Sequence, residues 1–152
     1  MKTLSLPLDV KNGRLLRAAT PRQAVDQFLR LLLDTPQNGC IADRDFGFIL
    51  NNLRFELFNE HEGVVYNSVT HEDDLSKEAG LYDKKISGSS RNLNTFAAEL
   101  KQAVERYEKR LTDVAATMTY IREERTIYIN VKGRLLPDLT NYSFTTTLKV
   151  WN

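Results

Sequence analysis

The sequence is short of cysteine and of long apolar runs, and each shortage excludes a class of protein. Its 152 residues include one cysteine, Cys40, so an intrachain disulfide is impossible and a reducing, cytosolic setting is expected. No apolar run approaches the roughly 20 residues that a membrane-spanning helix needs. The segment from Met1 to Pro7 also lacks the apolar stretch of a secretory signal. The chain is therefore expected to be soluble, without membrane insertion.

Positive and negative charges are also nearly balanced. There are 21 Lys and Arg against 20 Asp and Glu, for a net charge of +1. This balance argues against a nucleic-acid binder that relies on bulk charge and against a polybasic membrane surface. At 41% hydrophobic, the chain can bury a real core. We expect one domain over residues 1–152.

Motifs of cofactor and catalytic chemistry are absent too. The sequence has no G-x-G-x-x-G, no P-loop and no G-x-S-x-G. His61 and His71 lie near acidic residues but are not spaced as a metal-ligand pair, and neither is near Cys40, which we interpret as a small apolar filler. Glu56 and Glu60 share one helical face, as solvated carboxylates commonly do. We predict no metal and no cofactor, and a carboxylate-dependent peptidoglycan hydrolase remains a lesser alternative.

Three helices are predicted. The first has Thr20 as N-cap, Pro21 at its first position and Gln23 in a capping box, and it ends at Thr35-Pro36. The second should begin near Asp43, with Gly47 in its first turn indicating either a close backbone approach or a slightly later start. The third should run from Asn94 or Thr95 to about Arg110. Their apolar stripes are Val25, Phe28, Leu29 and Leu32; Phe46, Leu50, Leu53 and Leu57; and Phe96, Leu100, Ala103, Val104, Tyr107 and Leu111.

The strands come mainly at the end of the sequence. Residues 3–8 alternate as a short strand or extended arm before a turn at Asn12-Gly13, while 59–93 reads as a long polar connection with one strand near 64–66. Residues 113–121 and 126–135 form a hairpin, and 144–151 a last strand. This pattern predicts an α+β fold with about three helices packed on a small antiparallel β-sheet formed mainly by the C-terminal strands.

Two places are candidate protein-binding sites. Glu108 and Arg110 lie two apart where the third helix stops, so they cannot face each other across a regular helix. At least one should then be free to contact another group, unless both are simply solvated charges at a helix end. The last strand offers a second site, because an edge strand can accept a strand from another chain. That edge could instead be short, or covered by the N-terminal arm.

Four segments, in order, resemble one family. They are Leu6-Pro7-Leu8 with Gly13, the passage from Leu31 to Gly39, Asp43-Arg44-Asp45-Phe46-Gly47 with Leu53-Arg54-Phe55-Glu56, and Tyr107-Glu108-Lys109-Arg110-Leu111. Together they are similar to the baseplate wedge and sheath-initiator proteins of contractile tails, which include the TssE subunit of type VI secretion baseplates. The last segment resembles the family signature Glu-Pro-Arg-Leu. Lys109 stands at the family proline, so the helix is expected to run further here, and the long 59–93 connection looks specific to a subgroup.

The resemblance implies a non-enzymatic, structural role. Glu108 and Arg110 would dock on the wedge core of a baseplate, and the C-terminal strands would pair with the first ring of sheath proteins and initiate sheath polymerisation. The protein-binding residues implied are Glu108, Arg110, Leu111, Phe144, Leu148 and Val150. The expected location is the cytoplasm, near the inner membrane in a secretion system, with a monomer when isolated. A regulatory binding module of the same fold, like the related anti-adaptor proteins, is the alternative.

Overall fold

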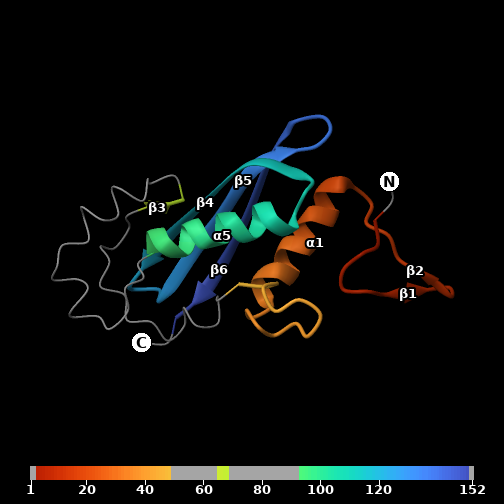
Figure 1. Cartoon of the computed structure of the whole chain (residues 1–152), viewed down its shortest axis with the longest axis horizontal. Coiled ribbons are helices and arrows are strands. Elements are labelled where there is room, and N and C mark those ends of the chain that lie inside the picture. The colour runs from red at the N-terminus through yellow and green to blue at the C-terminus, as the bar shows by residue number, and fades with distance from the viewer. Residues whose placement is uncertain (1–2, 49–64, 69–92, 151–152) are drawn as a thin grey trace.

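Two helices and two antiparallel sheets make up the part of the chain that the structure describes. The structure is a computed structural model, and it describes residues 3–48, 65–68 and 93–150 (Figure 1). Helix α5 (Leu93–Tyr107) crosses one face of a four-stranded sheet, and helix α1 (Pro21–Asp34) lies beside the C-terminal end of α5. The sheet has the order β3 (Val65–Asn67), β4 (Leu111–Ile121), β5 (Thr126–Leu135) and β6 (Thr140–Lys149). A small hairpin of β1 (Val10–Lys11) and β2 (Arg14–Leu15) projects away from the sheet.

The prediction of three helices is wrong, because the described residues contain two. The segment from Asp43 to Phe48, expected to begin a helix, consists of turns and bends. Gly47 has a φ of +116°, which no helix allows, and a Cβ there would lie 2.4 Å from the carbonyl oxygen of Thr35. The close backbone approach expected at Gly47 is therefore confirmed, although its helix is not. Residues 49–58 of that expected helix lie outside the described residues.

Helix α1 begins and ends where its sequence predicts. The Thr20 side chain accepts a hydrogen bond from the Gln23 amide at 3.1 Å, Pro21 occupies the first turn, and Thr35 is the extended C-cap. Its buried residues are Ala24, Val25, Leu29, Leu32 and Leu33. All of these except Ala24 belong to the core cluster that α1 shares with α5 and the sheet.

Helix α5 ends at Tyr107, three residues earlier than predicted. The Lys109 ammonium donates to the Glu105 carbonyl at 2.8 Å, and the Glu108 amide donates to the Val104 carbonyl at 2.8 Å. A lysine can satisfy a terminal helix carbonyl and favourably meets the negative end of the helix dipole. Lys109 thus accompanies termination of the helix, and the expectation that it would extend α5 is wrong.

The C-terminal strands follow their predicted alternation. Val114, Ala116, Met118 and Tyr120 of β4 are buried, as are Ile127, Ile129 and Val131 of β5. Short connections over 122–125 and 136–139 join β4 to β5 and β5 to β6. Strand β3, near the predicted 64–66, pairs with β4 at Tyr66 and Met118. The rest of the predicted polar connection, 59–64 and 69–92, lies outside the described residues.

Candidate functional site

The predicted docking residues Glu108 and Arg110 contact each other. Arg110 Nε donates to Glu108 Oε1 at 2.7 Å, and a terminal guanidinium nitrogen donates to Oε2 at 2.6 Å. The Arg110 backbone amide also donates to Oε1 at 3.0 Å. The expectation that the two side chains point apart is wrong, because it assumed a helix through residues that lie in a turn. The result is a bidentate ion pair between the planar guanidinium and carboxylate groups, the strongest geometry for an arginine–carboxylate contact.

The pair lies between α1 and the start of β4, with one member buried and the other partly exposed. The Glu108 side chain is 2% exposed, whereas that of Arg110 is 33% exposed. The Arg110 guanidinium lies 6.0 Å from the centre of the Phe28 ring and within 3.5 Å of the Ala24 carbonyl oxygen. The hydrogen bond to Glu108 raises the pKa of Arg110 above its ordinary value, so the cation is permanent. Glu108 is thereby satisfied, and Arg110 is the member that reaches the surface.

A second polar contact ties α1 to β6 next to this pair. The Tyr142 hydroxyl donates to Asp26 Oδ1 at 2.5 Å. Burial and this hydrogen bond raise the pKa of Tyr142 far above its ordinary value, so the phenol stays neutral. Arg22 lies 5.7 Å from the centre of the Tyr142 ring and donates to the Ser143 carbonyl at 3.4 Å. Helix α1 is therefore fastened to both the Glu108 turn and the outer strand of the sheet.

The other four predicted binding residues point into the core. Leu111, Phe144, Leu148 and Val150 are 6%, 5%, 3% and 4% exposed. These side chains belong to the core cluster, so the part of β6 that stays exposed is its outer backbone edge and the side chains on its opposite face. Their part in binding a partner stays a prediction.

Strand β6 is an open edge of the sheet within the described residues, paired with β5 and with no strand beyond it. The Val150 amide donates to the Arg125 carbonyl at 2.8 Å. This bond shows which residues of β6 direct their backbone groups toward β5 in the antiparallel register. By alternation, the even-numbered residues bond to β5 and the odd-numbered ones turn their N–H and C=O outward. The contact from Arg22 to the Ser143 carbonyl agrees with this phase. The outward set comprises Asn141, Ser143, Thr145, Thr147 and Lys149, all exposed.

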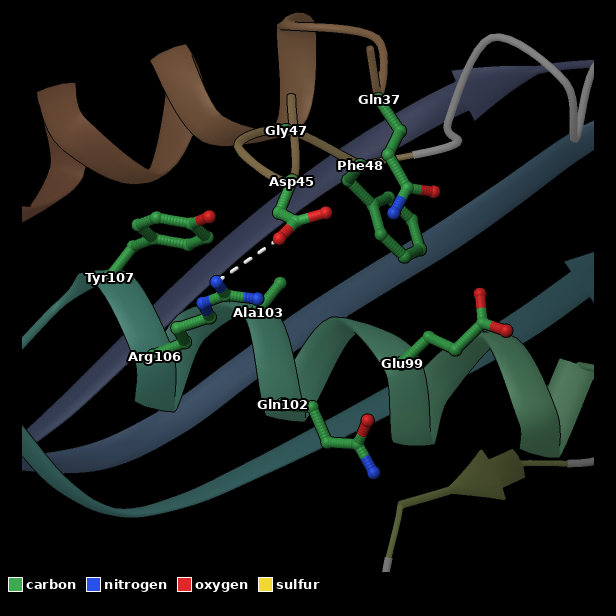
Figure 2. A pocket seen from close by; sticks show the side chains of 9 residues that line it. All are labelled: Gln37, Asp45, Gly47, Phe48, Glu99, Gln102, Ala103, Arg106 and Tyr107. Carbon is green, nitrogen blue, oxygen red and sulfur yellow. Dashed lines mark hydrogen bonds and ion pairs between the residues drawn. The ribbon is translucent and has the colours of Figure 1, made fainter. Parts of the chain in front are cut away.

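A polar hollow of about 340 Å³ lies between α5 and the loop that follows α1 (Figure 2). Arg106 forms an ion pair with Asp45 across it at 3.2 Å, and the Tyr107 hydroxyl donates to Asp43 at 3.0 Å. Phe46 packs edge-on against Tyr107, with ring centres 5.1 Å apart. These contacts hold the loop against α5. The Asp43 to Gly47 motif therefore fixes the loop, and the charges of Asp45 and Arg106 offset each other.

Candidate catalytic and metal-binding residues are not brought together in what the structure describes. His61, His71, Glu56 and Glu60 lie outside the described residues. Among the described residues, no group of three or more His, Cys, Asp or Glu could hold a metal ion. Neither α1 nor α5 combines the length and apolar character needed to cross a bilayer.

Three residues of the site are not predicted from the sequence to contact one another. Arg22, Asp26 and Tyr142 join α1 to β6, yet Asp26 and Tyr142 are 116 positions apart in sequence. A weak signal exists for Tyr142, since it falls on the buried side of the alternation in β6. Nothing in the local sequence identifies Asp26 as its acceptor.

Comparison with known proteins finds a likeness at the level of structure. No family model matches the chain, and no curated protein matches it. A crystal structure from Geobacter sulfurreducens, provisionally named a tail lysozyme, superposes with a TM-score of 0.51 at 16% sequence identity. The match covers 89% of this chain and 96% of that one. The likeness shows a shared fold, that of a protein named for a tail, over almost the whole length of both chains.

Proposed function

We propose that this chain is a structural component of the baseplate of a contractile injection machine, of the phage-tail or type VI secretion kind. It docks on the wedge core and initiates sheath polymerisation by accepting a sheath strand at β6. The fold shared with a tail protein supports this role, as do the ordered motifs of the sequence. The proposed location is the cytoplasm, and the proposed role is not enzymatic.

The open edge of β6 is the observation that carries the proposal. Its outward N–H and C=O groups belong to residues whose side chains are also exposed, and four of the five side chains are uncharged. Strand addition recognises backbone groups in register, with side chains adding selectivity. A ten-residue strand held rigidly by β5 on its other side is suited to template an incoming strand.

Arg110 is the proposed contact with the wedge, with Glu108 as the residue that positions it. Glu108 fixes the guanidinium through two side-chain hydrogen bonds, and Phe28 lies beneath one face of it. Among the described residues, no hydrogen-bond partner is found for the remaining guanidinium nitrogen, Nη1, of Arg110. That nitrogen can donate to a carboxylate or a backbone carbonyl of a partner.

Replacing Thr147 by proline tests strand addition at β6. The Thr147 amide points outward, so proline removes a donor from the free edge without breaking a bond to β5. Tagged wild type and Thr147→Pro are each recovered from the native host, and the co-purifying proteins are quantified by mass spectrometry. We expect sheath subunits to fall about tenfold or more while wedge proteins remain.

The matched control is Thr147→Val, which keeps the amide and the preference for a strand. It should recover sheath subunits as wild type does. Equal recovery of sheath subunits by the proline variant would refute strand addition at β6. Circular dichroism on the purified variants checks that both retain the fold.

A second pair of variants, Arg110→Ala and Arg110→Lys, tests docking. Alanine leaves Glu108 buried without its partner, so lysine is included to keep a charge beside it while losing the planar fork. Both should lose wedge proteins from the recovered complex, with Arg110→Lys still folded. If even wild type brings down no tail component, the structural role fails and a regulatory binding module becomes the function to pursue.

The name of the Geobacter protein makes a hydrolase the remaining alternative. Purified wild-type chain is incubated with peptidoglycan and the release of soluble fragments is followed. We expect no cleavage above buffer. Cleavage by wild type that disappears in Glu56→Gln would establish the enzymatic alternative.

A further inference from the structure

The β1–β2 hairpin exposes an unusual share of apolar side chains. Ten large hydrophobic residues in the described part of the chain are exposed, and five of them lie between positions 4 and 16. These are Leu4, Leu8, Val10, Leu15 and Leu16, which range from 36% to 62% exposed. The hairpin projects away from the sheet and from β6 (Figure 1). Apolar exposure concentrated on one short element is typical of an interaction surface.

The hairpin has a defined turn and is hydrogen-bonded to α1 at its base. Asn12 and Gly13 have φ of 54° and 70°, the conformation of a two-residue hairpin turn that matches strand twist. The Leu6 amide donates to the Gln27 side chain at 2.9 Å, and Gln27 donates to the Ser5 hydroxyl at 3.1 Å. Helix α1 thus holds the hairpin in place, which lowers the entropy lost when a partner binds.

The two faces of the hairpin differ in chemistry. Val10 lies directly opposite Leu15, and Lys11 lies directly opposite Arg14. Because successive side chains of a strand alternate, the first pair forms an apolar face and the second a basic face. The Leu16 amide donates to the Asp9 carbonyl, so the next pair, Val10 and Leu15, is a non-hydrogen-bonded pair. Side chains of such a pair lie closer together than those of a hydrogen-bonded pair.

Lys11 and Arg14 have no ion pair within the described residues, although Asp9 lies on the same side of β1 by alternation. Like charges directly opposite on a hairpin destabilise it. The Asp9 carboxylate accepts from the Val10 amide at 2.8 Å. A carboxylate supplied from outside would relieve this repulsion while Val10 and Leu15 enter an apolar pocket.

We propose that the β1–β2 hairpin docks into another protein, in an apolar pocket bordered by Asp or Glu side chains. An anionic membrane fits less well, since residues 3–20 hold no aromatic side chain and three basic ones, fewer than lipid-binding clusters use. This surface is separate from β6, so it does not rest on the strand addition proposed above.

Site-specific photo-crosslinking in the native host tests the proposal on the full chain. A benzophenone amino acid replaces Leu15 and, as the matched control, Ile41, which is 99% exposed outside the hairpin. We expect position 15 to crosslink to a peptide of a different protein that carries apolar and acidic residues. Adding Lys11→Glu with Arg14→Glu should lower the yield about tenfold, whereas Ile41→Ser should not change it.

Charge reversal then decides specificity. Changing the crosslinked partner's acidic residue to lysine should restore the yield in the Lys11→Glu, Arg14→Glu variant. Crosslinking to a second copy, to lipid, or only to the products seen from position 41 would overturn the proposal. The Thr147→Pro variant should keep the hairpin crosslink, so failure here and failure at β6 are told apart.

Discussion

The β5–β6 and β1–β2 hairpins obey the same pairing rules but differ in what covers them. Strands β5 and β6 pair over ten positions, and one face of both strands is buried in the core. Strands β1 and β2 pair over two positions, and all four strand residues are exposed. Alternation of apolar residues predicts β5 and the second half of β6. In the N-terminal region the sequence predicts the turn at Asn12-Gly13 correctly but places the strand over residues 3–8, where the structure has only an isolated bridge from Leu4 to Arg17. The cover supplied by other elements decides whether a strand stabilises the fold or remains available to a partner.

Trimming an apolar side chain in each hairpin gives the largest contrast. Ile129 of β5 is fully buried, and its replacement by alanine should lower the free energy of unfolding by about 3 kcal/mol. Val10 is 62% exposed, and Val10→Ala should change it by less than about 0.5 kcal/mol. Urea unfolding measures both. Similar losses in the two variants would mean that the hairpin is part of the cooperative core.

Breaking the contact of Glu108 with Arg110 tests how the sheet is fastened to α1. Glu108→Gln keeps the shape of the side chain but leaves Arg110 without its counter-charge, so we expect a loss of about 2 kcal/mol. We expect a smaller loss of unfolding free energy than for a fully buried ion pair, because Arg110 is one-third exposed. Urea unfolding checks the value, and an unchanged midpoint would show that the pair contributes nothing.

Tyr142 makes the stability of the β6 side depend on pH. Its raised pKa means that the unfolded chain loses this proton more readily than the folded one. The contribution is present below the ordinary tyrosine pKa of about 10 and is lost as pH rises above it, by up to about 1.4 kcal/mol per pH unit. Unfolding of wild type and Tyr142→Phe is compared from pH 8 to pH 11. Parallel pH profiles for the two proteins would contradict this assignment.

The smallest global effect is expected at the turn of the exposed hairpin. Gly13→Ala strains a residue with a φ of +70° but meets no atom within 4 Å. The strain, about 1 kcal/mol, should open the hairpin locally and change global stability by about 0.5 kcal/mol or less. Amide hydrogen exchange should accelerate at Lys11 and Arg14 and stay constant in β5. Faster amide exchange in β5 as well would show that the two hairpins unfold as one cooperative unit.

The sequence predicts elements whose signals are local. Thr20, Pro21 and Gln23 mark the start of α1, and alternation in β4 and β5 identifies their buried faces. The expected helix after Asp43 fails because Phe46 and Phe48 suit several backbones, whereas the positive φ of Gly47 depends on its approach to Thr35. Helical spacing alone does not contain that tertiary contact.

The candidate site is predicted in its residues but not in its geometry. Glu108 and Arg110 stand out in the sequence, yet their pairing follows from a helix that ends at Tyr107. The hydrogen bond of Asp26 with Tyr142 and the contact of Arg22 with Ser143 span most of the chain. Such contacts depend on how α1 meets β6, which no local pattern encodes.

The chemistry of the β6 edge also bears on how copies of the chain behave toward one another. An open strand can seed polymers of its own chain as readily as it receives a partner, and natural edges limit this with polar and charged side chains. Here Lys149 lies at one end, threonines follow, and Arg22 occupies the Ser143 carbonyl near the other. These groups should reduce the rate at which copies of the chain adhere to one another through β6.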